Sequence, residues 1–229
     1  MKFSRAIIRE NARGFAAVIP DIKCVSPKHG DLLRGRDPVE TARLLVDCGA
    51  PVLSVVTERK NFGGSLTLLR DIAQATGVPV LAKDFFASEA AIEEAGAMGA
   101  SAVLLICATT KSDLLARLYN HAQTLGLEPL VEVCSVEEMQ FARQLGAQLV
   151  GINNRNIATL ELDSGGVSRT AELAGLAPEN ALLISESGIV LPEDAILAVA
   201  ARASAVLVGT ALWQADDMAA AYQALRVKL

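Results

Sequence analysis

The chain has little of several residue types that mark particular kinds of protein. Only 4% of its 229 residues are aromatic, and it has two histidines and four cysteines. His29 and His121 lie far apart and belong to no cluster of ligand-type residues, so we expect no metal site. The cysteines form no CxxC pair, which favours reduced thiols packed in the interior over a disulfide framework.

Long apolar runs and an excess of positive charge are also missing. The longest apolar run, 102–108, has the length of a strand, whereas a membrane span needs about 18–20 residues. The apolar stretch 15–19 after the basic N-terminus is too short for the core of a signal peptide, so we expect a cytoplasmic protein without a membrane partner. The net charge of −5 argues against a nucleic-acid partner but leaves room for a local phosphate pocket.

What is present is a regular alternation of short apolar runs and segments of helical pattern. Apolar residues make up 52% of the chain, enough for a large core. Strands alternating with helices predict parallel βαβ units, and eight units favour a single (βα)₈ TIM barrel over residues 1–229. No GxGxxG turn follows the first strand, which weakens a dinucleotide-binding interpretation. The predicted strands are Ala17–Lys23, Val52–Val56, Val80–Lys83, Ala102–Cys107, Leu130–Val133, Leu149–Ile152, Leu182–Ser185 and Ala205–Val208.

Several helices carry recognisable start and stop signals. Pro38 stands at a favoured first helical position, and Pro192 does the same for a later helix. Ser135 followed by Glu138 resembles a capping box, and Gly146 is placed to end that helix.

Polar residues gather where the predicted strands end. Active sites of TIM barrels lie at the C-terminal ends of the strands, so side chains from different strands are expected to converge there. A rim ion pair explains any one of them, but a set drawn from five strands indicates a site. These residues are Asp21, Lys23, Lys83, Asp84, Glu132, Asn153, Arg155, Glu186 and Ser187.

Glycines follow the last two strands, at Gly188 and Gly209. Glycine lets backbone N–H groups approach an anion, so a phosphate is expected there. Cys107 and Cys134 also end strands, but neither has a histidine base nearby in sequence, so we favour packing over a nucleophilic role.

In combination the motifs resemble the indole-3-glycerol-phosphate synthase family, from about Ile19 to Trp213. The resemblance implies a barrel that closes the indole ring of 1-(2-carboxyphenylamino)-1-deoxyribulose 5-phosphate with loss of carbon dioxide and water, in tryptophan biosynthesis, without metal or cofactor. The stretches that carry it are IPDIKCVSPKHG, SVVTERKNFGGS, VPVLAKDFF, EPLVEV, GINNRN, SESGI and VLVGTALW.

The resemblance also implies roles for individual residues. Lys83 would be the general acid, Glu132 the general base of the dehydration, and Lys23 an assisting cation. Asp21 is the carboxylate two residues before Lys23, and Asn153 and Glu186 would orient the substrate. Substrate or phosphate would be bound by Ser26, Arg155, Ser187, Gly188, Gly209, Thr210, Phe62, Phe85 and Ile157.

This chemistry sets expectations for the two lysines. Burial and a nearby Lys23 are expected to lower the pKa of Lys83 and so make it an effective acid. As a strand-end residue at the barrel mouth, Lys83 is also expected to contribute little to packing.

Two departures from the family pattern bear on the substrate. Asp21 stands where the family usually has glutamate, and fewer than twenty residues precede the first predicted strand, whereas typical members have a longer N-terminal segment that helps cover the substrate. Both departures predict weaker binding of the aromatic ring of the substrate, and therefore a higher KM. The alternatives are a related phosphate-binding barrel with another phosphorylated substrate and a non-catalytic barrel that binds a metabolite. The sequence does not indicate an oligomeric state.

Overall fold

The computed structural model describes residues 2–155 and 166–229. Eight parallel strands close into a barrel in the order β1, β10, β9, β8, β7, β6, β5, β4, and β4 pairs back to β1. The barrel strands are β1 (Ala17–Ile22), β4 (Leu53–Val56), β5 (Val80–Lys83), β6 (Ala102–Ile106), β7 (Glu128–Val133), β8 (Leu149–Asn153), β9 (Leu182–Glu186) and β10 (Ala205–Val208). The predicted (βα)₈ barrel is therefore confirmed, and each predicted strand end lies within two residues of the observed one.

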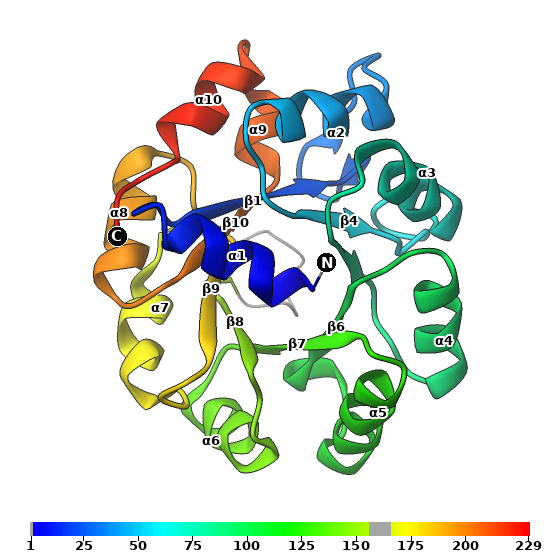
Figure 1. The fold of residues 1–229 in the computed structure, drawn as a ribbon, viewed down its shortest axis with the longest axis vertical. Helices are drawn as coiled ribbons and strands as arrows, with labels where there is room; N and C mark the ends of the chain where they lie inside the picture. Colours follow the sequence, from blue (N-terminus) through cyan, green and yellow to red (C-terminus); the bar gives the residue numbers. More distant parts are fainter. Residues whose placement is uncertain (1, 156–165) are drawn as a thin grey trace.

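Helices surround the barrel, as Figure 1 shows. Side chains cap two of the helices whose starts were predicted. The carboxylate of Asp37, the residue before Pro38, accepts from the backbone of α2, and Ser135 Oγ accepts from Glu138 N at 3.3 Å. Gly146 ends α6 in the left-handed conformation that glycine favours. The helices are α1 (Phe3–Asn11), α2 (Pro38–Asp47), α3 (Leu66–Thr76), α4 (Glu89–Ala97), η1 (Cys107–Thr109), α5 (Ser112–Thr124), α6 (Val136–Leu145), α7 (Ser168–Leu173), η3 (Ala174–Leu176), α8 (Pro192–Ala200), α9 (Thr210–Gln214) and α10 (Met218–Ala224).

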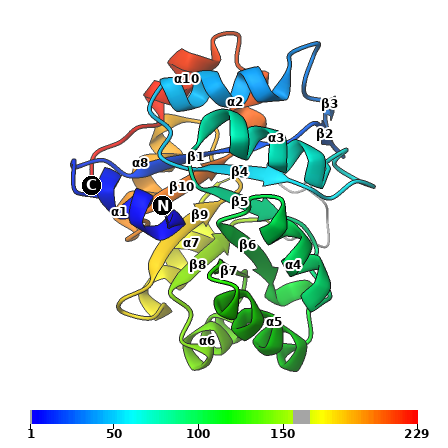
Figure 2. The same ribbon diagram turned by 45° about the vertical axis from the view of Figure 1, so that its right-hand side comes forward.

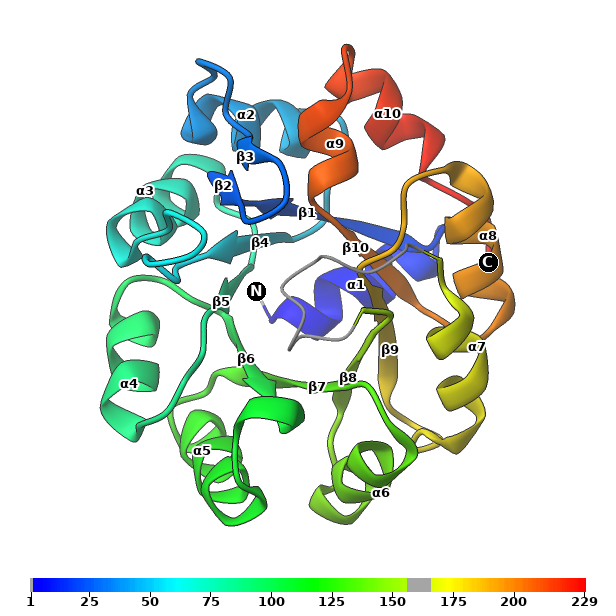
Figure 3. The same cartoon turned by 180° about the vertical axis from the view of Figure 1, so that it is seen from behind.

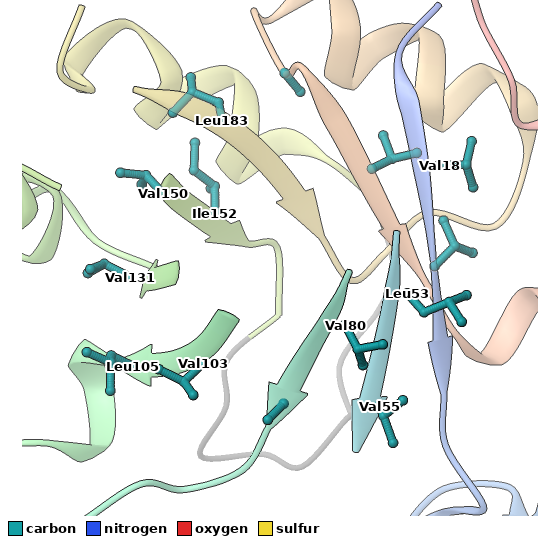
Figure 4. Packing of buried hydrophobic residues seen from close by; sticks show 14 of the residues in the cluster. Val18, Leu53, Val55, Val80, Val103, Leu105, Val131, Val150, Ile152 and Leu183 are labelled. Carbon is teal, nitrogen blue, oxygen red and sulfur yellow. The ribbon is translucent and has the colours of Figure 1, made fainter. Parts of the chain in front are cut away.

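Neighbouring residues along most of the strands enter two separate apolar clusters. The larger cluster packs strands against helices and includes Val18, Val103 and Leu183 (Figure 4). The smaller one fills the barrel interior, where Ile19 and Leu104 are buried. This division follows from the strand period of two, which sends neighbouring side chains to opposite faces.

The N-terminal helix α1 closes one end of the barrel. Phe3, Ala6 and Ile7 are buried and belong to the interior cluster. The helix is also held to the starts of two strands, because Glu128 accepts from Ser4 N at 3.0 Å and Asn11 Nδ2 donates to Ser204 O at 2.9 Å. Figure 1 shows α1 across the opening, and Figure 2 shows it on the side away from the β2–β3 hairpin. The strand-based prediction did not include this helix.

The C-terminal segment returns to α1. Glu10 on α1 is buried and forms ion pairs with Arg226 and with Arg13. Phe15 forms an isolated antiparallel bridge with Lys228, and the Arg226 guanidinium lies 4.7 Å from the centroid of the Phe15 ring. Both ends of the chain thus stabilise the N-terminal face of the barrel.

The opposite face carries the strand C-terminal ends. A short hairpin, β2 (Val25–Ser26) and β3 (Gly30–Asp31), follows β1 there and stands beside the opening in Figure 3. Across the described residues, no helix is long and apolar enough to cross a membrane.

Candidate active site

The inward-facing positions of the barrel change from apolar to polar along the strands. On β7, Leu130 lies in the interior cluster and the buried Glu132 follows two residues later. On β9, Ile184 and Glu186 repeat the pattern. Because a strand alternates faces, each polar residue points to the same side as the apolar one before it. The residues that extend these inward positions are Asp21, Lys83, Glu132, Asn153 and Glu186.

A pocket lies over these residues. It encloses about 660 Å³ of empty space, a volume that includes open solvent at its mouth. Ten of the predicted site residues line it, and apolar side chains form much of the rest. The lining residues are Asp21, Lys23, Val56, Glu58, Phe62, Lys83, Asp84, Phe85, Leu104, Ile106, Glu132, Asn153, Arg155 and Ser187.

Lys83, which lines the pocket, forms an ion pair with Glu186, which is not among the lining residues. Lys83 Nζ lies 3.1 Å from Glu186 Oε2, and the Glu186 side chain is fully buried. Burial alone lowers the pKa of Lys83, but the carboxylates of Glu186, Asp21 and Glu132 raise it above its ordinary value. The prediction of a lowered Lys83 pKa is therefore wrong, because the three carboxylates outweigh burial.

Glu132 is a buried carboxyl whose protonation changes near neutral pH. Burial and the Glu186 carboxylate raise the pKa of Glu132 to about 7, although Lys83 and a hydrogen bond with Asn153 lower it. Within the part of the chain that the structure describes, Glu132 Oε2 is buried and has no hydrogen-bond partner. A group with this pKa can take up or release a proton in a reaction at neutral pH.

Asp21 is held on three sides. Its Oδ1 accepts a hydrogen bond of 2.7 Å from Ser54 Oγ, and its carbonyl oxygen accepts one of 2.9 Å from Trp213 Nε1. Gly209 packs against it, since a Cβ at that glycine would lie 3.3 Å from Asp21 Cβ and Oδ2. Asp21 thus fixes a negative charge beside Lys83.

Lys23 lies between an aromatic ring and the end of β10. Its Nζ donates to Thr210 Oγ1 at 3.4 Å and lies 5.7 Å from the centroid of the Phe62 ring. Phe62 is positioned by Glu58, whose carboxylate accepts from Asn61 N at 2.7 Å and from Phe62 N at 3.1 Å. Glu58 was not among the predicted site residues, and its only sequence signal is its place in TERKNFGGS.

The predicted phosphate-binding residues occupy different positions. Ser187 lines the pocket and Gly188 follows it directly. Ser26 is buried in the β2–β3 hairpin, where its Oγ accepts from Lys28 N and His29 N at 3.3 Å, and it is not in the pocket lining. Ile157 lies outside the described residues.

The four cysteines are free thiols. Burial, followed by the nearby Glu138, raises the pKa of Cys107 to about 12 and that of Cys134 to about 11. Both thiols remain protonated near neutral pH, which supports packing over a nucleophilic role.

Most of the chain is similar to proteins of one family. The family model described as indole-3-glycerol phosphate synthase matches residues 1–225. An indole-3-glycerol phosphate synthase of Pyrococcus abyssi is 45% identical over 201 residues, covering 87% of this chain and 86% of the relative. That of Thermococcus kodakarensis is 45% identical over 201 residues, with 88% of each chain covered. That of a Nocardioides species is 44% identical over 202 residues, covering 88% of this chain and 76% of the relative. The chain belongs to the indole-3-glycerol phosphate synthase family.

Proposed function

We propose that this protein converts 1-(2-carboxyphenylamino)-1-deoxyribulose 5-phosphate to indole-3-glycerol phosphate, carbon dioxide and water. The observation that carries the proposal is the placement of Lys83 and Glu132 in one pocket at the C-terminal end of a barrel of this family. The apolar residues that line this pocket, among them Leu104 and Ile106, suit the aromatic ring of the substrate.

Ring closure uses Lys83. The ring carbon that bears the carboxylate attacks the ketone carbon, and the carbonyl electrons move to its oxygen. Because its pKa is raised, Lys83 stays cationic until that oxygen becomes basic, then stabilises the alkoxide and gives it a proton. The bond to the carboxylate then breaks, carbon dioxide leaves, and the ring regains its aromaticity.

Dehydration uses Glu132. The new hydroxyl leaves as water with a proton supplied by Lys23, and Glu132 removes the proton from the neighbouring carbon as the indole double bond forms. A carboxyl with a pKa of about 7 suits this role, because it is partly ionised at neutral pH and still basic enough to take a proton.

Further residues orient the reacting groups and bind the two ends of the substrate. Asn153 and Glu186 orient Glu132 and Lys83 through their bonds to them. Phe62 and Phe85 contact the aromatic ring. The phosphate lies on the side of Ser187, Gly188, Gly209 and Thr210, with Lys23 and Arg155 as cations and Ser26 as a supporting residue.

The test is to incubate the protein with the substrate and follow indole fluorescence and carbon dioxide release. Lys83→Met and Glu132→Gln are each expected to lower kcat by about 10²–10⁴-fold. Lys111→Ala, at an exposed lysine outside the pocket, is the matched control and should leave kcat unchanged. A Lys83→Met protein with more than half the wild-type kcat would refute the assignment.

A further inference from the structure

Asn154, the residue after Asn153, has a side chain that links three elements. Its Nδ2 lies 3.0 Å from Ser185 Oγ, 3.0 Å from Glu186 O and 3.1 Å from Ser187 O. Its Oδ1 accepts from Thr170 N at 2.9 Å and from Thr170 Oγ1 at 3.0 Å. These partners fix the orientation of the amide, because a backbone N–H can only donate and a carbonyl oxygen can only accept.

The donors of Asn154 act on a strained turn. Ser187 has φ of 64° and Gly188 has φ of 73°. Glycine adopts the left-handed region freely, but serine does so only where surrounding contacts hold it. Asn154 Nδ2 donates to the carbonyl oxygens of Glu186 and Ser187, which are the two carbonyl groups that flank the Ser187 Cα. These two hydrogen bonds hold the left-handed conformation of Ser187.

The turn continues directly into the pocket. Ser187 lines it, while the Glu186 side chain before it is anchored independently by Lys83. Gly188 packs closely against the backbone of Gly166, since a Cβ at position 188 would lie 2.2 Å from Gly166 O. A change in the turn therefore moves Ser187 and the N–H groups that follow, and leaves the Lys83–Glu186 pair in place.

We propose that Asn154 is a positioning residue for substrate binding, which holds the Ser187–Gly188 turn in the conformation that receives the anionic end of the substrate. The inference rests on the proposed function for the identity of that substrate. Because the reacting groups are not displaced, removing the donors of Asn154 raises KM and spares kcat.

The test compares Asn154→Asp with Thr170→Val. In Asn154→Asp the carboxylate still accepts from Thr170, but it has no donor for the turn and faces two carbonyl oxygens. KM is expected to rise about tenfold, equivalent to about 1.4 kcal/mol, with kcat within about twofold of wild type. Thr170→Val keeps the donors of Asn154 and removes only the hydroxyl contacts, so it should lower Tm and leave KM within about twofold.

A second background separates positioning from general destabilisation. Glycine at position 187 takes the left-handed conformation without support, so in Ser187→Gly the added Asn154→Asp change should raise KM by less than about threefold. An equal rise in both backgrounds would overturn the inference, as would an Asn154→Asp protein that melts lower but has an unchanged KM.

Binding of inorganic phosphate, measured by calorimetric titration, needs no turnover. Asn154→Asp should weaken it about tenfold and Thr170→Val should not. If wild type fails to turn over the substrate but shows this pattern, the proposed function is wrong and the role of Asn154 stands. If wild type is active and phosphate binds equally to both variants, the role of Asn154 is wrong and the function stands.

Discussion

Replacing Lys83 by alanine should destabilise the fold as well as stop turnover. Lys83 forms an ion pair with Glu186, whose side chain is 0% exposed, whereas that of Lys83 is 21% exposed. The substitution leaves a buried carboxylate without its cation. Removing one partner of a buried pair costs about 3–5 kcal/mol, and we expect about 3 kcal/mol near pH 8 because Lys83 is partly solvated.

The loss should depend on pH. Burial raises the pKa of Glu186, and the attraction of Lys83, which lowers it, disappears in the variant. A carboxyl whose folded pKa exceeds its unfolded value of about 4.3 loses folding stability as pH rises between the two values, by at most about 1.4 kcal/mol per pH unit. The variant should therefore be closest to wild type near pH 5 and fall further behind toward pH 8.

Urea unfolding at pH 5, 6.5 and 8 measures this difference. Lys111→Ala controls for loss of an exposed lysine, and the double variant Lys83→Met with Glu186→Gln should recover most of the stability because neither charge remains. A Lys83→Ala protein as stable as wild type at pH 8, or equally destabilised at every pH, would refute this account of the pair.

Three further outcomes follow from the geometry. In Gly151→Ala the new Cβ would lie 2.0 Å from Glu186 Oε1, so the free energy of unfolding should fall by about 1–3 kcal/mol. Gly146→Ala is the comparison, because a Cβ at Gly146 meets no atom within 4 Å and tests only the strain of a left-handed backbone. For wild type, kcat/KM should rise with pH through about 7 as Glu132 ionises, and Glu132→Gln should abolish that limb of the profile. Trp213→Phe removes the hydrogen bond to Asp21 O and should lower stability by about 1 kcal/mol in thermal unfolding, while Phe141→Leu serves as a packing control.

The strands could be predicted from sequence because each carries its own local signal. Val80–Lys83 and Ala205–Val208 were predicted with their observed ends, since both are short β-branched and apolar runs between helical segments. The helix α1 was missed although its buried residues Phe3, Ala6, Ile7 and Glu10 follow the helical spacing i, i+3, i+4, i+7. What no local pattern encodes is the surface against which this helix packs. Its partner Arg226 lies at the other end of the chain.

The site was predictable as a set of residues but not in its electrostatics. Strand ends identify Lys83 and Glu132 as neighbours in a barrel mouth, and both line the pocket. The direction of the Lys83 pKa depends on which group lies 3.1 Å away, and that group is Glu186, 103 residues later in the chain. Asn154 belongs to the stretch GINNRN, one of those that carry the family resemblance. Its role, however, depends on a turn formed by two left-handed residues, Ser187 and Gly188, and the sequence does not reveal that turn.

Closure of the barrel by the first and last strands has a consequence for the chain while it is being synthesised. The backbone groups of Ala17 to Pro20 pair with Ala205 to Val208, and ribosomes deliver the N-terminus first. Throughout translation of the intervening chain, one side of β1 is an unpaired strand edge of the kind that invites wrong pairing. A nascent chain stalled before residue 205 should therefore be sensitive to protease and bind chaperones. Once β10 has left the ribosome and pairs with β1, the protease sensitivity and the chaperone binding should both disappear.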